Sequence, residues 1–425
     1  MVSRKATAAL AAAALSTLVT CTSIRAQTTQ PASADQPKLL QEAPAAVAAE
    51  PDRRPIMQAL NYAGIAQPLE KARINIFGHA EAGYTQNFDS PESGLNFGRV
   101  FDFKSNQLMF NQLDLTVERT LDPTKWDVGG RMEWIYGEDA GTIHSNGLFD
   151  WYELQRAKGD SHNSPTDQWD LNQLYADFGV PLSEGLRIRV GKYVTPMGYE
   201  TINPTTNPFY SHSYLFGFAI PFTQTGVIAT YQYNDNWTFE GGVFRGWEQS
   251  WEDNNDAVSF DGRVAFTSTD KKLSLIGQFV TGPEEPDDSR DYRTVFDMVA
   301  SYAFTDKFTL AANSDFGWEG AAAPDGGTAY WYGIAGYAGY KLNDYVTLNA
   351  RAEWFRDEEG VRIGIAGNYY ELTLGATIHP FPHDRWGKNL LVRPEIRGDW
   401  SNNDVYNDGD NSSMYTAAID VIYLF

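Results

Sequence analysis

The sequence predicts an all-β protein, a closed antiparallel transmembrane β-barrel of about 16 strands connected as an up-and-down meander. Three observations predict this fold. Hydrophobicity alternates with a period of two from residue 73 onward, the connections between the alternating segments are short and long in turn, and the chain ends in an alternating segment whose last residue is Phe425. Strict alternation is typical of strands that have one apolar and one polar face.

The first 26 residues have the layout of a secretory signal peptide. A short basic head and an apolar run over residues 6–19 lead to a cleavage point after Ala26. The run is too short for a membrane helix, which needs about 20 apolar residues. The alternative is a lipid-modified start at Cys21, because residues 18–21 read LVTC, the outline of a lipobox with an unfavourable Thr before the cysteine.

Composition excludes several classes of site. Cys21 is the only cysteine, so a chain cleaved after Ala26 has no disulfide, zinc–cysteine site or cysteine nucleophile. The formal net charge is −22 and becomes −25 when the three basic residues of the signal are removed. A chain of this charge repels nucleic acid, which we exclude as a partner.

The mature chain divides into two parts. Residues 27–50 are rich in Ala, Pro, Gln and Thr, and we interpret residues 27–71 as a periplasmic linker, largely disordered. One short helix is expected over residues 54–63, with a lumen plug as the alternative role. Residues 72–425 form the predicted outer-membrane β-barrel.

Sixteen alternating runs are found from Arg73 onward. In the first, Ile74, Ile76, Ala80, Ala82 and Tyr84 share the apolar face, and the next two lie around residues 112–118 and 126–136. The other thirteen centre near Tyr175, Ile188, Ala229, Phe239, Phe260, Leu275, Met298, Leu310, Ile334, Ala350, Leu374, Val392 and Ile419.

The connections sort by length. The links after even-numbered runs are usually short, such as residues 122–125, 234–235 and 343–344, although the last, residues 380–389, is longer. The links after odd-numbered runs tend to be long and polar, such as residues 90–105 and 137–167. Outer-membrane barrels have short periplasmic turns and long external loops. The alternation therefore predicts a meander with both termini on the periplasmic side.

Closure of the sheet follows from the cost of an open edge in lipid. Each unpaired edge amide would cost several kcal/mol in hydrocarbon. The apolar face must point outward, because charges near the bilayer midplane cost about 2–4 kcal/mol each. The polar face then lines the lumen, which at about 16 strands is wide enough to hold water.

The inward faces carry more acids than bases. The predicted inward acids are Glu81, Asp114, Glu118, Asp127, Glu133, Asp177, Glu240, Asp261, Asp297, Asp315, Glu353, Asp357, Glu371, Glu395, Asp399 and Asp420. The inward bases are Arg131, Arg187, Arg189, Arg263, Arg293, Arg351, Arg393 and Arg397. Sixteen acids and eight bases leave a lumen excess of −8, which predicts a mild cation preference.

Six of these charges form a sharper cluster on three successive runs: Arg351, Glu353, Glu371, Arg393, Glu395 and Arg397. Opposed charges at matching heights would produce a transverse field that favours polar solutes. Pro394 lies within the cluster. Because a closed barrel has no edge strand to accommodate a proline, we expect a β-bulge there.

The connection over residues 195–221 is too apolar for an exposed loop. Its candidate constriction residues are Tyr199, Phe209, Tyr210, Tyr214 and Phe216. We expect the loop to fold into the barrel and narrow it. The alternative is packing on the rim or against a neighbouring protomer.

No catalytic or metal site is predicted. The six histidines show no spacing typical of a metal site or a Ser-His-Asp arrangement, and the acidic external loops are expected to be solvated. Paired carboxylates with many Trp residues could suggest a soluble glycosidase, but the Trp residues more often mark strand ends, as an interfacial girdle does. No cofactor is expected.

Several segments resemble the OmpL-like β-barrel porin family. They are residues 191–200 (GKYVTPMGYE), 207–214 (NPFYSHSY), 221–226 (PFTQTG), 351–357 (RAEWFRD) and 393–400 (RPEIRGDW). The similarity covers residues 72–425. The resemblance implies more about fold than about substrate.

The resemblance and the barrel together imply a porin in the outer membrane of a diderm bacterium, through which small hydrophilic solutes or ions diffuse passively. A surface structural or adhesive barrel with a closed lumen is the alternative. The expected partners are outer-membrane lipid, the solutes, and the barrel assembly machinery, which would read the terminal strand ending at Phe425. The sequence does not fix the oligomeric state, and a homotrimer is one possibility because trimers are common among porins of this size.

Overall fold

The structure is a computed structural model that describes residues 53–150 and 167–425. The predicted signal peptide, Cys21 and the first part of the predicted linker lie outside the described residues. So do residues 151–166 of one predicted loop. No helix in the described part of the chain is long and apolar enough to cross a membrane.

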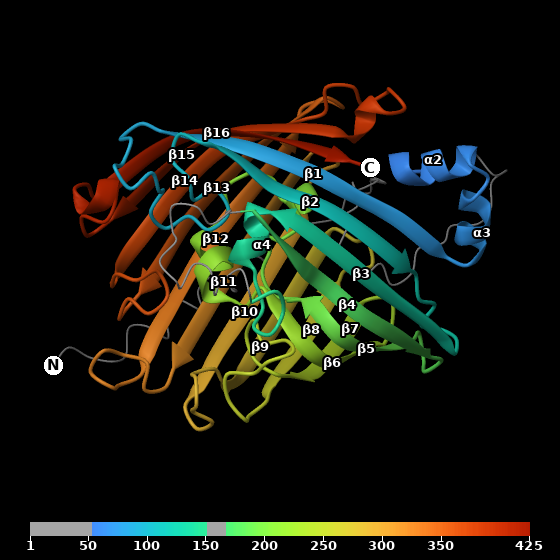
Figure 1. Cartoon of the computed structure of the whole chain (residues 1–425), viewed down its shortest axis with the longest axis horizontal. Helices are drawn as coiled ribbons and strands as arrows, with labels where there is room; N and C mark the ends of the chain where they lie inside the picture. The colour runs from blue at the N-terminus through green and yellow to red at the C-terminus, as the bar shows by residue number, and fades with distance from the viewer. Residues whose placement is uncertain (1–52, 151–166) are drawn as a thin grey trace. The chain divides into compact units, whose positions relative to one another are not determined.

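Sixteen antiparallel strands close into one barrel (Figure 1). They are β1 (Ile74–Asn87), β2 (Leu108–Arg119), β3 (Asp127–Gly137), β4 (Gln168–Val180), β5 (Leu186–Val194), β6 (Thr223–Gln232), β7 (Trp237–Phe244), β8 (Ser259–Thr267), β9 (Leu273–Pro283), β10 (Tyr292–Ala303), β11 (Phe308–Glu319), β12 (Ala329–Lys341), β13 (Val346–Asp357), β14 (Gly367–Ile378), β15 (Leu390–Ser401) and β16 (Ser413–Leu424). Each strand pairs with its neighbours in sequence, and β1 pairs with β16. The predicted fold class is confirmed.

The barrel closes through the end of the chain. In Figure 1 the first strand, in blue, lies beside the last, in red. Gly78 and Phe425 exchange two backbone hydrogen bonds of 2.9 Å, so the terminal residue takes part in the closure. Closure leaves no unpaired edge for lipid to contact.

The outer face is apolar, as the period of two predicts. Leu115, Phe279, Ile334 and Leu374 are all 37–50% exposed, and outward positions such as these alternate with buried inward ones along their strands. Charged residues on this face would be costly in hydrocarbon, whereas the inner face can carry them.

Two β-bulges re-aim side chains into the barrel. The pairing register shifts opposite Glu81 and at Glu133, and the extra residues are Asn111 in β2 and Asn172 in β4. Both asparagines are at most 2% exposed. Asn111 Nδ2 donates to Asp139 Oδ1 at 3.0 Å. The bulge therefore directs the side-chain amide of Asn111 into the barrel interior, as a regular strand would not.

The bulge predicted at Pro394 is wrong. The pairing of β15 with β16 runs through Pro394 without a shift. On the other side of β15, the pairing with β14 is interrupted. It stops at the pair Gly375–Glu395 and resumes in the same register at the pair Ile378–Val392. Proline has no N–H to donate, and a local gap in one ladder accommodates that loss without an extra residue.

Part of the predicted linker is helical. The predicted helix is present as α2 (Pro55–Tyr62), with Pro55 in the favourable first turn, and a second helix, α3 (Ala66–Lys71), follows it. Both helices contact β1, and the guanidinium of Arg54 lies 4.7 Å from the Phe77 ring. The end of the linker therefore packs on the barrel instead of extending away as disordered chain.

Candidate functional site

The predicted charge cluster lies on the inner face of β13, β14 and β15. Glu353 pairs directly with Glu371, which pairs with Asp399, so three carboxylates form one row across the strands. In the neighbouring row, Thr373 lies between Arg351 and Arg397. All five charged side chains are at most 6% exposed. Buried charges of this density require close partners.

Those partners come from the segment between β5 and β6, residues 195–222, which we call the inserted loop. It crosses the barrel interior. Tyr214 Oη donates to Asp399 Oδ1 of β15 at 2.8 Å, and Tyr210 Oη donates to Asn111 Oδ1 of β2 at 3.0 Å. Phe209 and Phe216 are each 2% exposed. The inserted loop includes the single turn η1 (Pro204–Thr206) and the π-helical turn η2 (Leu215–Ala219).

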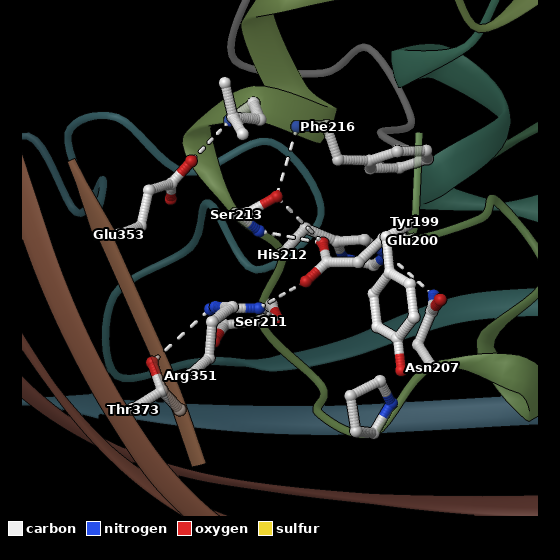
Figure 2. Close-up of polar contacts among 12 residues, drawn as sticks. Tyr199, Glu200, Asn207, Ser211, His212, Ser213, Phe216, Arg351, Glu353 and Thr373 are labelled. Atoms are coloured by element: carbon white, nitrogen blue, oxygen red, sulfur yellow. Dashed lines mark hydrogen bonds and ion pairs between the residues drawn. The ribbon is translucent and has the colours of Figure 1, made fainter. Parts of the chain in front are cut away.

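The β13 charges bind the inserted loop directly (Figure 2). Arg351 Nη1 donates to Glu200 Oε1 at 2.7 Å and to the Ser211 carbonyl at 2.8 Å. The two oxygens of Glu353 accept the backbone N–H groups of Tyr214 and Leu215, both at 2.7 Å. Each wall charge thus recognises loop backbone that would otherwise be unsatisfied inside the barrel.

The β15 charges hold residues 204–212 of the inserted loop in the same way. Arg393 Nη1 donates to the carbonyls of Pro204 and Asn207 at 2.7 and 2.8 Å. Arg397 donates to the His212 carbonyl at 2.6 Å. Glu395 Oε2 accepts the backbone N–H of Tyr210 at 2.9 Å. Arginines therefore take the loop carbonyls and glutamates take its N–H groups, a charge-assisted pattern that fixes one loop conformation.

The apolar residues of the inserted loop complete its fit. Leu215, Phe216 and Ile220 belong to one buried cluster with inner-face side chains of β12 and β13, among them Trp331. Trp331 Nε1 also donates to the Ala219 carbonyl at 3.1 Å. This burial explains why residues 195–221 are too apolar for an external loop.

The structure separates the predicted pore-lining residues into two groups. Arg351, Glu353, Glu371, Arg393, Glu395, Arg397 and Asp399 are buried by the inserted loop. Arg187, Arg189, Arg263 and Arg293 lie on the inner face of β5, β8 and β10 and are partly exposed. Five residues of the six-residue cluster therefore bind the loop directly, and the sixth, Glu371, pairs with Arg351, so the transverse field predicted for the cluster does not face open water. The pore-lining role of the second group stays a prediction.

Several residues of the site were missed in the sequence because period two does not extend into loops. Arg99, from the loop after β1, inserts beside Asp399, with Nη2 to Oδ2 at 2.7 Å. Glu200 and Ser211 are central to the β13 anchor. Asp139 in α4 (Glu138–Thr142) accepts from Gln112. The only available signal was the apolar composition of the inserted loop, which marked the segment without assigning its polar contacts.

His212 and Glu200 are the titratable groups at the centre of the inserted loop. The His212 ring lies 4.3 Å from Phe101 and 4.9 Å from Phe216, centroid to centroid. Burial lowers the pKa of His212 to about 4, with Glu200 opposing the shift and Arg351 and Arg393 adding to it. Burial alone would raise the pKa of Glu200, but Arg351 and His212 hold it below its ordinary value.

These directions predict that acid loosens the inserted loop. A released loop would return His212 to a pKa near 6.5, so protonation favours release as the pH falls from about 6.5 towards 4, by up to about 3 kcal/mol. Glu200 adds to this effect near and below pH 4.5. Single-channel recordings should therefore show more open-channel fluctuation at pH 4.5 than at pH 7.5. His212→Gln should reduce the difference, and an unchanged pH response in that variant would contradict the assignment.

The fold and the site together define a class. A closed sixteen-stranded barrel with an apolar outer face, a charged inner face and the inserted loop folded inside is a porin-type barrel of the bacterial outer membrane. The chain belongs to the family described as "Putative beta-barrel porin-2, OmpL-like", which matches residues 73–425. The predicted family and location are confirmed, and this membership indicates a channel-forming barrel.

Solved structures share the fold at low sequence identity. The outer membrane channel DcaP of Acinetobacter baumannii is 9% identical with a TM-score of 0.55, covering 83% of this chain and 97% of that one. OprB of Pseudomonas putida is 10% identical with a TM-score of 0.55, covering 86% and 97%. An anion-selective porin from Comamonas acidovorans is 10% identical with a TM-score of 0.54, covering 83% and 99%. No curated protein matches the sequence.

Proposed function

We propose that this porin lets small hydrophilic solutes and ions diffuse passively along the part of the lumen that the inserted loop leaves uncovered. One observation carries the proposal: inner-face charges differ in exposure around the barrel. The inner-face arginines of β13 and β15, Arg351, Arg393 and Arg397, are at most 3% exposed. Side chains on β2, β3 and β5 are more open, with Arg131, Arg187 and Arg189 at 10–16% and Glu118 at 25%. The diffusion path therefore follows this second wall.

Cation preference is the finer part of the proposal. The sixteen acids and eight bases assigned to the inner face from sequence leave an excess of −8. Many of these charges are paired, as Arg189 is with Asp177 at 2.8 Å, so the preference is mild. Salt screens such a wall over about 10 Å at 0.1 M.

Reversal potentials across planar bilayers test this selectivity. In a KCl gradient the expected sign is that of K⁺ preference, and the permeability ratio should fall towards one as the mean salt concentration rises. Removal of one wall acid that is partly open, by Glu118→Gln, should lower the ratio. The matched change Asp344→Asn, in the β12–β13 turn, should leave it unchanged. Clear Cl⁻ preference in the native protein would reject the proposal.

One observation favours a second candidate, a surface structural barrel with a closed lumen. The inserted loop and Arg99 together bury most inner-face charges of β13–β15. Reconstitution separates the two functions. Ion conductance above the bilayer background supports a porin, and its absence from a correctly inserted barrel supports the closed alternative.

The proposed assembly partners follow from the same architecture. The last strand, β16, ends at Leu424, and the next residue, Phe425, exchanges backbone hydrogen bonds with Gly78 of β1, so the barrel assembly machinery would read a segment that is needed for closure. A homotrimer is proposed because trimers are common among porins of this size. Crosslinking in native outer membranes checks the trimer.

A further inference from the structure

A row of polar side chains crosses the inner wall of strands β5 to β10, on the side of the barrel opposite the charges of β13 and β15 that bind the inserted loop. Direct cross-strand pairing joins Arg187 of β5, Thr230 of β6, Glu240 of β7, Arg263 of β8, Gln278 of β9 and Asp297 of β10. Strands in a barrel tilt, so a row of paired residues rises along the axis. It begins at the second residue of β5, beside a short turn, and reaches Asp297, whose Oδ2 accepts the Gly198 N–H of the inserted loop at 2.6 Å.

Glu240, in the middle of this row, belongs to a set of hydrogen-bonding side chains that we call the inner-wall acceptor cluster: Tyr193, Glu240 and Asp261. Asp261 lies on the same face of β8 as Arg263, the pairing partner of Glu240, and two residues before it. Tyr193 is 1% exposed and its hydroxyl makes no hydrogen bond within the described residues. The Tyr193 ring belongs to one buried cluster with Ile228, which pairs with Gly242, the residue that pairs with Asp261. The oxygens of Asp261 and Oε1 of Glu240 are likewise buried and have no hydrogen-bond partner in the described part of the chain.

Glycine keeps this stretch of wall clear of side chains. Gly242 lies between Ile228 and Asp261 in the pairing register, and a Cβ there would come 2.7 Å from Asp261 Oδ1. Gly191 and Gly226 pair with each other one row above. Any side chain at Gly242 would displace the Asp261 carboxylate from its position.

The atoms that need partners define the ligand. A primary ammonium group has three N–H donors and a positive charge, which matches the acceptors of Tyr193, Glu240 and Asp261. Buried polar atoms without partners cost free energy that a ligand with matching groups recovers. Arg263, two residues after Asp261 on the same inner face, adds a guanidinium whose Nε also has no partner among the described residues. Two residues along a strand span about 7 Å.

We propose that this wall is a binding subsite for small zwitterions of the amino-acid type, with the ammonium on the inner-wall acceptor cluster and the carboxylate on Arg263. The inference rests on the proposed porin function and names a solute class for it. A solute leaving the edge of the inserted loop at Asp297 meets the subsite next along the row. It then passes Thr230 and Arg187 towards the short-turn end of the barrel.

The test compares two ligands of similar length in single-channel recordings: 4-aminobutanoate, which carries both charges, and n-butylammonium, which carries only one. Both should block the K⁺ current through the native protein, and the neutral n-butanol should not. Asp261→Asn should raise the half-blocking concentration of both ligands about tenfold, the loss expected for one charge-assisted hydrogen bond.

The second variant, Arg263→Gln, should change the block by the two ligands in opposite directions. It should raise the half-blocking concentration of 4-aminobutanoate and lower that of n-butylammonium, because it removes a carboxylate partner and a repelling charge together. Opposite shifts in one variant cannot come from partial unfolding. The control Asp344→Asn changes a carboxylate in the exposed β12–β13 turn and should leave both values unchanged.

The outcomes separate the two proposals. If the native protein conducts K⁺ and neither variant changes block by either ligand, the subsite is refuted and the porin function stands. If the inserted protein does not conduct, the porin function fails. Calorimetric titration of 4-aminobutanoate into the detergent-solubilised barrel then tests the binding subsite independently of conductance, and the absence of heat of binding refutes the subsite.

Discussion

Replacement of Arg351 by alanine is expected to release the inserted loop from β13 and to increase the single-channel conductance. The guanidinium joins Glu371, Glu200 and the Ser211 carbonyl, and it also lies 5.1 Å from the Phe209 ring. Its loss leaves two buried carboxylates without their main partner. Breaking a buried ion pair by removing one member costs about 3–5 kcal/mol, which is more than most single loop contacts can restore.

The measurement is planar-bilayer conductance together with the unfolding temperature of the purified barrel. Arg351→Lys should be intermediate, since it keeps the charge but loses the fork that reaches several acceptors at once. Arg356→Ala, five residues along the same strand and on the opposite face, is the matched control and should behave like the native protein. Native conductance in Arg351→Ala would show that the loop is held without this residue.

Removal of residues 199–218, with a short Gly-Ser connection in their place, is expected to have the largest effect on permeation. The sixteen strands and their pairing do not depend on these residues, so the barrel should still form. Conductance should rise roughly twofold or more because the segment that crosses the interior is gone. The charges of β13 and β15 would then face water, and selectivity should become sensitive to them.

Shortening the exposed residues 324–327, between β11 and β12, provides the control for a loop deletion as such. It should leave conductance unchanged. Liposome swelling with sugars of increasing size gives a second measure, and the size limit should increase only when the inserted loop is shortened. Equal conductance with and without residues 199–218 would show that the inserted loop does not narrow the path.

The strands were predictable because one physical constraint acts along the whole barrel. Lipid outside and polar groups inside force a period of two, and all sixteen predicted runs coincide with strands. The helix at Pro55–Tyr62 was also predictable, from its proline start and apolar residues. The next helix was not, because its six residues, AQPLEK, carry no periodic signal of their own.

The sequence also indicated which loop enters the barrel but not what it does there. An apolar loop cannot remain in water, so residues 195–221 had to be covered. Whether Arg351 and Glu353 face a pore or a loop depends on contacts more than 130 residues apart in the chain, and no local pattern encodes them. The backbone at Pro394 could not be predicted either, because the same local sequence is compatible with a gap in the hydrogen-bond ladder and with a β-bulge.

The sequence by itself determined the two-faced strands and their number and order, because side-chain direction in a strand is fixed by position alone. Only the tertiary structure decided which of the inner-face charges stay open to the lumen. That depends on how the inserted loop crosses the interior and on which arginines and glutamates satisfy its backbone. Strand position determines the face on which a charge lies, and the fold of a distant segment determines whether water reaches it.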